Sequence, residues 1–326
     1  MSSSHKLSTA GALVIHGRWD TIVQQFRAHW RAHRLRRSGS RPFVHRTAGF
    51  PLICFPDMPD SCSQYLHGAD DRWEVELLRD WLCPGDAFID AGANLGLYAH
   101  AIASHFSGRV RVLAVEPSPY LVGRLREAAD RLRESGLTAV QSAAGHETGE
   151  TDFFIARPGL TTVSQSIRMD AESVSDYEPH RVPMDTLGGL SSAYLGDARV
   201  AAVKLDVEGA EPLALKGAPA SWLSSDGPLW LIEINVPVLA RMGFGASDII
   251  RWFPVPSFER WLIPKYPYST GVEPKPRLVS ERDGFCDARF YNFVAVPSGP
   301  AQAERRARVL TRFQHKRGRS IAAPPR

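Results

Sequence analysis

The chain has 326 residues, of which 44% are hydrophobic and 10% aromatic, as in an ordinary soluble globular protein. This length suits one large α/β domain with extensions or two small domains. No window of about 18 residues is apolar throughout, and residues 1–30 lack the pattern of a secretory signal peptide. We therefore predict no membrane span and a cytoplasmic location. The four cysteines form neither a C-x-x-C pair nor a cluster with zinc-type spacing, so we expect reduced thiols.

Charge is unevenly distributed along the chain. Residues 1–46 hold nine Lys and Arg against one acid, a charge of +8, and residues 301–326 hold eight against one acid, a charge of +7. Because the whole chain carries +4, the residues between carry −11. The basic ends are either solvated helices and tails, which we favour, or contacts for nucleic acid, a membrane surface or an acidic partner. We divide the chain into an N-terminal extension (1–70), a central domain (71–300) and a basic C-terminal tail (301–326).

The N-terminal extension mixes helical and extended patterns. Residues 19–37 (WDTIVQQFRAHWRAHRLRR) place apolar side chains near one face with arginines around the rest, which predicts a basic amphipathic helix. Residues 42–62 contain four prolines among short apolar runs and are expected to form edge strands and loops. Residues 70–82 begin with acids and carry an apolar stripe, which predicts a helix leading into the central domain.

A buried strand, a glycine turn and a helix come next. Residues 87–89 are apolar enough for a strand covered on both faces, and residues 98–106 have the spacing of a helix packed on a sheet. Between them, Gly92 and Gly96 allow positive φ values and leave backbone N–H groups free at a helix N-terminus, where an anionic group is stabilised. The order G-A-N-x-G, centred on Asn94, differs from the G-x-G-x-x-G pattern of dinucleotide-binding proteins and disfavours NAD.

A second buried strand, residues 110–117, contains Glu116 near its end. An acid about twenty residues after the glycine turn can accept hydrogen bonds from vicinal ribose hydroxyls. Asp90 ends the first strand, and the two acids together suit an adenosyl group that bears an amino acid. We therefore predict S-adenosylmethionine as the ligand. The alternative is a turn whose glycines are merely structural.

The remaining elements follow in the order of an open parallel sheet. A third strand is expected at residues 138–142, and its end would face the adenine ring with Ser142 and Ala143. Residues 151–156 suit another strand, and the polar segment 157–182 is predicted to be a long loop that acts as a lid or substrate wall. Later strands are expected at residues 200–205, 229–234, 259–263 and 289–296, the last within a terminal antiparallel pair.

Acidic residues gather where the fourth strand of the sheet ends. Asp206 and Glu208 follow residues 200–205, and ligands of an open parallel sheet bind outside the carboxyl ends of its strands. We predict that both acids lie near the reacting methyl group. Asp206 is the favoured general base, because burial or neighbouring acids would raise its pKa. The rival interpretation is a magnesium site, in which Asp206, Glu233 and Asn235 lower the pKa of a bound hydroxyl.

Taken together, five segments resemble the FkbM-type family of S-adenosylmethionine-dependent methyltransferases: FIDAGANLGLY, AVEPSPY, VPMDTLGGL, AVKLDVEGAEPLALKGA and LWLIEIN. The resemblance implies a class I, Rossmann-like α/β fold, with a seven-stranded, mostly parallel sheet, helices on both faces and an antiparallel last strand. It also implies methyl transfer to hydroxyl oxygens of sugars or secondary metabolites. The predicted cofactor site consists of Asp90, Gly92, Ala93, Asn94, Gly96, Glu116, Pro117, Ser118, Ser142 and Ala143.

Two classes of methyl acceptor remain. The first is a small molecule or glycan that offers a hydroxyl, and the second is RNA or another nucleic acid held by the basic ends of the chain. Enzymes that methylate bases usually carry an N/D-P-P-Y/F motif after the fourth strand, which stacks on the base and grips its amine. Residues 206–209 instead read D-V-E-G. We therefore favour a small-molecule or glycan O-methyltransferase.

Overall fold

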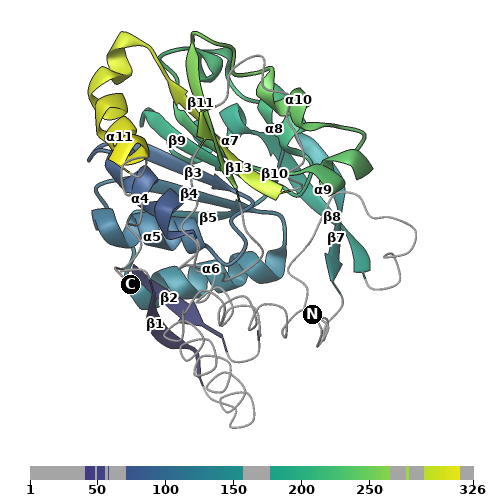
Figure 1. Cartoon of the computed structure of the whole chain (residues 1–326). Helices are drawn as coiled ribbons and strands as arrows, with labels where there is room; N and C mark the ends of the chain where they lie inside the picture. Colours follow the sequence, from purple (N-terminus) through teal and green to yellow (C-terminus); the bar gives the residue numbers. More distant parts are fainter. Residues whose placement is uncertain are drawn as a thin grey trace, which may run out of the picture.

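The computed structural model contains an open, twisted β-sheet with helices on both faces (Figure 1). The structure describes residues 41–47, 50–55, 58, 71–156, 177–264, 277–278 and 290–315. The helix predicted at residues 19–37 lies outside them. Within the described ranges, no helix is both long enough and apolar enough to cross a membrane.

The main sheet follows the predicted topology. Among the described residues it has eight strands, in the order β12-β11-β13-β10-β9-β3-β4-β5. Strands β10, β9, β3, β4 and β5 run parallel, while β13 is antiparallel to both of its neighbours. The predicted seven-stranded sheet with an antiparallel last strand is confirmed, and the short β12 adds an outer edge. The strands are β3 (Ala87–Ala91), β4 (Arg111–Glu116), β5 (Leu137–Gln141), β9 (Val200–Leu205), β10 (Leu229–Asn235), β11 (Phe258–Pro264), β12 (Arg277–Leu278) and β13 (Phe290–Pro297).

The direction in which the sheet grows reverses between β3 and β9. From β3 the chain adds β4 and β5 on one side, and it then returns to add β9 and β10 on the other. At such a switch point the loops after the two central strands diverge and leave a crevice outside the carboxyl ends. The loop after β3 holds the glycine turn and the loop after β9 begins with Asp206, so the fold brings both predicted features to one place.

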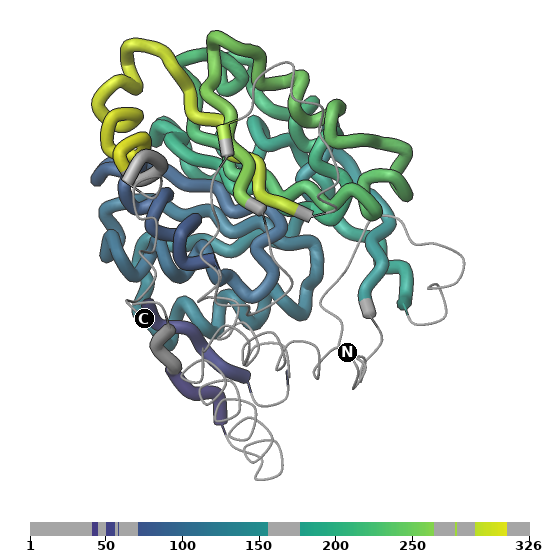
Figure 2. The backbone as a smooth tube through the Cα atoms, viewed as in Figure 1, coloured from purple at the N-terminus to yellow at the C-terminus, as the bar shows by residue number. Residues whose placement is uncertain are grey.

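Two hydrophobic cores cover the two faces of the sheet. Every residue of β3 and β9 is buried, as expected for central strands with helices on both sides. One face packs against α4, α5, α6 and α11, and the other against α7, α8, α9 and α10 (Figure 2). The helices are α4 (Arg72–Trp81), α5 (Leu97–Phe106), α6 (Pro119–Leu132), α7 (Leu187–Tyr194), α8 (Glu211–Lys216), α9 (Val236–Arg241), α10 (Ala246–Ile250) and α11 (Ala303–His315), with 3-10 turns η2 (Ala220–Leu223) and η3 (Pro300–Gln302).

Two smaller β-units flank this framework. Strands β1 (Phe43–Thr47) and β2 (Phe50–Cys54) form an antiparallel hairpin, and β2 lies against α5, which agrees with the strands expected within residues 42–62. Strands β6 (Ala143–Gly145), β7 (Gly149–Ala156) and β8 (Tyr177–Thr186) form a separate three-stranded sheet in the order β6-β8-β7. This second sheet starts just after β5 ends, at the edge of the main sheet where its parallel strands have their carboxyl ends.

The prediction of a loop over residues 157–182 is wrong for its last part. Residues 177–182 belong to β8, which pairs with β7 in antiparallel register. Pro179 and Pro183 cannot donate to a strand ladder, but along this stretch β8 pairs with β7 alone, because β6 reaches only residues 184–186. An edge tolerates proline for that reason. Residues 157–176 lie outside the described part of the chain.

The C-terminal helix α11 is attached to the domain through its basic side chains. Val309 is fully buried in the core that contains α4. The Arg305 guanidinium binds both carboxylate oxygens of Asp86, and Nη2 of Arg306 lies 2.8 Å from Oε2 of Glu259. Several cations of the basic C-terminal segment are therefore neutralised within the chain.

Candidate active site

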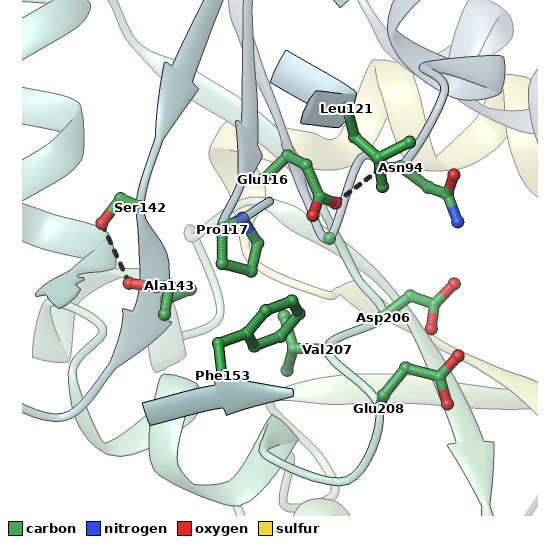
Figure 3. A pocket seen from close by; sticks show the side chains of 12 residues that line it. Asn94, Glu116, Pro117, Leu121, Ser142, Ala143, Phe153, Asp206, Val207 and Glu208 are labelled. Carbon is green, nitrogen blue, oxygen red and sulfur yellow. Dashed lines mark hydrogen bonds between the residues drawn. The ribbon is translucent and has the colours of Figure 1, made fainter. Parts of the chain in front are cut away.

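A pocket opens at the switch point, outside the carboxyl ends of β3, β4 and β9. Its wall is formed by the glycine turn after β3, the end of β4, the start of the second sheet and the loop after β9 (Figure 3). Figure 3 shows Asp206 and Glu208 next to each other, away from Ser142 and Ala143. The lining residues are Gly92, Asn94, Glu116, Pro117, Leu121, Ser142, Ala143, Ala144, Phe153, Asp206, Val207 and Glu208.

Glu116 is held by backbone N–H groups at one end of this pocket. Its Oε2 accepts a hydrogen bond of 2.9 Å from the Asn94 N–H, and its Oε1 accepts one of 3.0 Å from the Ser118 N–H. The side chain is buried, and this burial outweighs the two hydrogen bonds and raises the pKa of Glu116 to about 7. A carboxylate whose position is fixed in this way can still accept hydrogen bonds from a ligand, because each oxygen has a second lone pair.

The turn after β3 needs glycine for close packing as well as for the positive φ values that were expected. A Cβ on Gly92 would lie 1.7 Å from the carbonyl oxygen of Asp206, so this glycine allows two backbone segments to meet. A Cβ on Gly96 would lie 2.4 Å from a methyl carbon of Leu125 and 2.9 Å from Nε2 of His100. Both glycines have positive φ. They therefore permit close packing within the protein, and Gly92 alone of the two lines the pocket.

Asn94 lies at the centre of the same turn. Its φ of 52° is in the left-handed region, which asparagine tolerates better than most residues. Its N–H donates to Glu116, while its buried Oδ1 has no hydrogen-bond partner among the described residues. A buried polar atom without a partner is unfavourable, so an amide oxygen in this position is suited to a donor on a bound ligand.

A buried cation links β3 to the loop after β9. Nζ of Lys204 lies 3.0 Å from Oδ2 of Asp206 and 3.7 Å from Oδ1 of Asp90. It also donates to the Gly92 carbonyl oxygen at 3.4 Å. Burial alone would lower the pKa of Lys204, but the nearby carboxylates outweigh it and raise that pKa, so the side chain stays charged. Of the two carboxylates, only that of Asp206 belongs to a residue that lines the pocket.

Glu208 is the second acid at this end of the pocket. It has a φ of 53°, which is strained for a residue with a long side chain, and it is followed by Gly209 at 98°. Burial, together with the charges of Asp206, Glu233 and Glu211, raises the pKa of Glu208 well above its ordinary value. A glutamate with a raised pKa is a better proton acceptor than an ordinary surface carboxylate.

Glu211 stabilises the loop itself. Its Oε1 accepts hydrogen bonds from the N–H groups of Val207 and Gly209, at 3.0 and 3.2 Å. Burial raises its pKa to about 8. Because Glu211 does not line the pocket, its contacts are those of a residue that shapes the loop.

A match to a protein family covers this part of the chain. The family described as "Methyltransferase FkbM domain" matches residues 90–261, which is more than half of the sequence and includes both ends of the pocket. The chain belongs to the FkbM methyltransferase family. The comparison with curated proteins gave no significant match.

Solved structures with similar folds include several methyltransferases. An rRNA methylase from Streptococcus thermophilus is 10% identical, with 69% of this chain and 95% of that chain covered and a TM-score of 0.38. A SAM-dependent O-methyltransferase from Thermotoga maritima is 11% identical, with coverage of 68% and 63% and a TM-score of 0.34. A precorrin-6y C5,15-methyltransferase from Geobacter metallireducens is 13% identical, with coverage of 69% and 88% and a TM-score of 0.34. Such low scores carry no inference about the acceptor.

Most, but not all, of the residues predicted for this FkbM methyltransferase line the pocket. Asp90 instead accepts a hydrogen bond of 3.0 Å from the Ala99 N–H and so holds the first turn of α5. Ser118 caps α6, where its side chain accepts from the Leu121 N–H. Ala93 and Gly96 also lie outside the lining. The lining residues that the prediction missed are Leu121, Ala144, Phe153 and Val207.

Asp206, which the sequence offered both as a general base and as a magnesium ligand, is paired with a lysine. Within the described ranges, no group of three or more His, Cys, Asp or Glu side chains is arranged to hold a metal ion. The Asp206 carboxylate contacts the Lys204 ammonium. Oδ2 of Asp206 is thus already paired with a cation.

Proposed function

We propose that this chain transfers a methyl group from S-adenosylmethionine to a hydroxyl of a small molecule or glycan. The observation that carries the proposal is that one pocket contains Glu116 and Asn94 from the glycine-turn side and Asp206 and Glu208 from the β9 side. The first pair is suited to binding a nucleoside that bears an amino acid. The second pair supplies proton acceptors beside it.

The residues around the glycine turn fit this methyl donor. The Glu116 carboxylate can accept hydrogen bonds from two ribose hydroxyls, since its two other hydrogen bonds come from backbone N–H groups. The buried Asn94 Oδ1 can accept from an ammonium group. Phe153 and Ala143 offer an apolar surface for an aromatic ring. When bound, S-adenosylmethionine supplies an electrophilic methyl group on a positively charged sulfur.

The acids after β9 act on the acceptor in this proposal. Asp206 accepts the hydrogen bond, and then the proton, of the attacking hydroxyl, which keeps that oxygen aligned with the methyl carbon. The side chain of Asp206 is 25% exposed, so an acceptor can reach it. Glu208 lies beside it and accepts the proton where the geometry of the acceptor favours this second carboxylate.

Two observations support a small hydroxylated acceptor over a nucleic acid. The loop after β9 reads D-V-E-G and has no aromatic side chain for stacking on a flipped base. Two arginines of α11 that could bind phosphates are paired with acids of the chain, Arg305 with Asp86 and Arg306 with Glu259. We extend the proposal to a cytoplasmic enzyme whose catalytic unit is residues 71–300.

The proposal is tested by binding and by methyl transfer. Calorimetry should show micromolar or tighter binding of S-adenosylhomocysteine and no comparable binding of NAD. The full chain, incubated with methyl-labelled S-adenosylmethionine, should label sugars or hydroxylated metabolites in a mixed panel and leave RNA unlabelled. Preferential labelling of RNA would overturn the acceptor class, and preferential binding of NAD would overturn the proposal as a whole.

A further inference from the structure

Lys204 is unusual among the residues of β9. The strand is buried along its whole length, and its other five residues are Val, Ala or Leu. Lys204 is the one charged residue of the strand, and it is only 6% exposed. Burying an ammonium is unfavourable, and a buried ion pair commonly adds little stability over apolar residues of similar size. The fold alone therefore does not account for a lysine here.

The contacts of Lys204 connect three parts of the site. Asp90 lies opposite Lys204 in the register of β3 and β9, and its carboxylate is one of the two that contact the ammonium. The same carboxylate accepts a hydrogen bond from the Ala99 N–H and so holds α5. The Gly92 carbonyl belongs to the glycine turn. Asp206 alone of these partners presents a side chain to the pocket. The Lys204 ammonium does not line the pocket, so it can affect a ligand only through the groups it holds.

Building on the proposed function, we propose that Lys204 is a positioning residue that holds the Asp206 carboxylate toward the site of methyl transfer. The ammonium fixes Oδ2 of Asp206 at 3.0 Å and ties it to the glycine turn at the same time. The pocket thereby keeps a negative charge in a defined place. A ligand that carries a positive charge at the transferred methyl group or next to it is favoured over one that is neutral there.

Two ligands measure this effect without any acceptor. S-adenosylhomocysteine is a neutral thioether, whereas sinefungin has a carbon in place of the sulfur and an ammonium in place of the transferred methyl group. Their affinity ratio at one pH reports how strongly the pocket favours a cation at the position of that methyl group. Wild-type protein should bind sinefungin more tightly than S-adenosylhomocysteine.

A positioning role and a simple charge effect give opposite results for Lys204→Met. If Lys204 positions Asp206, its loss leaves the buried Asp90 carboxylate and the partly exposed Asp206 carboxylate without their counter-ion. The Asp206 side chain is then no longer held, and the preference for sinefungin falls by about tenfold or more. If Lys204 acts only as a nearby positive charge, removing it strengthens cation binding and the preference rises. A rise or an unchanged ratio would overturn the inference.

Matched variants make the result specific. Asp206→Asn should lose the preference as Lys204→Met does, and the double variant should lose no more than either one, because both changes remove the same interaction. Lys216→Met removes an exposed lysine on α8 and should leave the ratio unchanged. Additive losses in the double variant would contradict action through Asp206.

Lys204→Arg covers the case in which Lys204→Met is too unstable to purify. Arginine keeps the charge but has a longer, planar head group, so it should displace the Asp206 carboxylate and lower the preference. A pure charge effect would leave the ratio as in wild type. Wild-type protein that binds neither ligand would overturn the proposed function and this inference together, whereas binding of both ligands with an unchanged ratio in Lys204→Arg would overturn the inference alone.

Discussion

The two ends of the pocket hold their carboxylates by different means. Glu116 accepts hydrogen bonds from the backbone N–H groups of Asn94 and Ser118, so its position follows from the path of the main chain. Asp206 is held by a side chain, the ammonium of Lys204, and remains 25% exposed. We propose that the two ends have different tasks. The Glu116 end, here called the rigid end, binds the methyl donor, and the Asp206 end, here called the open end, receives the acceptor and supports the chemistry.

The two ends also touch directly at the backbone. The Asp206 N–H donates to the Ala91 carbonyl at 3.0 Å, and Gly92 packs on the carbonyl of Asp206. The distance between the ends is therefore fixed by main-chain contacts, even though the carboxylates are held differently. Four predictions follow from this contrast, in order of decreasing effect.

Gly92→Ala should separate the two ends and have the largest effect. Its Cβ would meet the Asp206 carbonyl at 1.7 Å, in addition to the strain of a positive φ. We expect loss of S-adenosylhomocysteine binding and about 3 kcal/mol lower unfolding free energy, from denaturant titration. Gly85→Ala is the matched control, because Gly85 also has a positive φ but its Cβ would meet no atom within 4 Å. It should cost about 1 kcal/mol and keep binding. Equal effects would contradict the close approach.

Asp206→Asn should affect chemistry and leave the rigid end intact. Loss of a proton acceptor at the open end should lower kcat by roughly 10²- to 10⁴-fold while the affinity for S-adenosylhomocysteine stays nearly unchanged. The measurement is a single-turnover methyl-transfer assay with an acceptor found in the labelled panel. If Asp206 and Glu233 instead hold magnesium, EDTA should abolish turnover and Glu233→Gln should be as damaging as Asp206→Asn. Near-normal turnover of Asp206→Asn would return Asp206 to a structural role.

Glu116→Ala should affect the rigid end and leave chemistry intact. It removes a charged hydrogen-bond acceptor, which corresponds to a loss of roughly 1.5 to 3 kcal/mol in the binding of S-adenosylhomocysteine by calorimetry. At saturating donor, kcat should be close to that of wild type. Unchanged affinity would remove Glu116 from the site. A loss of kcat without a loss of affinity would mean that the two ends are not separate in their tasks.

The sequence predicted the central framework well because that part is locally encoded. Apolar runs at residues 87–89 and 200–205 correspond to β3 and β9, and the acids that follow them occupy the strand ends as expected. Asp90 shows where such reasoning stops. Its place at a strand end was correct, but only the register with Lys204 reveals that its carboxylate faces a buried ammonium and α5. The spacing of residues within a short segment does not predict how strands more than a hundred residues apart pair with each other.

Phe153 shows the same limit in the second sheet. Residues 151–156 were predicted to form a strand, which β7 confirms. The prediction did not indicate that β6, β7 and β8 form a sheet beside the end of β5, and this arrangement alone brings Phe153 into the pocket. The pairing of β8 with β7 depends on long-range contacts, such as Val182 opposite Thr151, and these prevail over two prolines.

The pH dependence of ligand binding gives the finest test of the rigid end. Glu116 accepts ribose hydrogen bonds best when ionised, and burial raises its pKa to about 7. Affinity for S-adenosylhomocysteine should therefore rise about tenfold between pH 6 and pH 8 and then level off. Glu116→Gln should remove this rise, whereas Glu211→Gln should retain it, because Glu211 does not line the pocket.

The same pKa shift affects the stability of the protein without ligand. The contribution of Glu116 to the free energy of unfolding should be full below pH 4.5, the ordinary pKa of a glutamate, and should be lost as pH rises through about 7. The reason is that the folded chain releases this proton at a higher pH than the unfolded chain. Calorimetry and thermal melts over this pH range measure both effects, and affinity that falls as pH rises would show that Glu116 binds the ligand as a protonated donor.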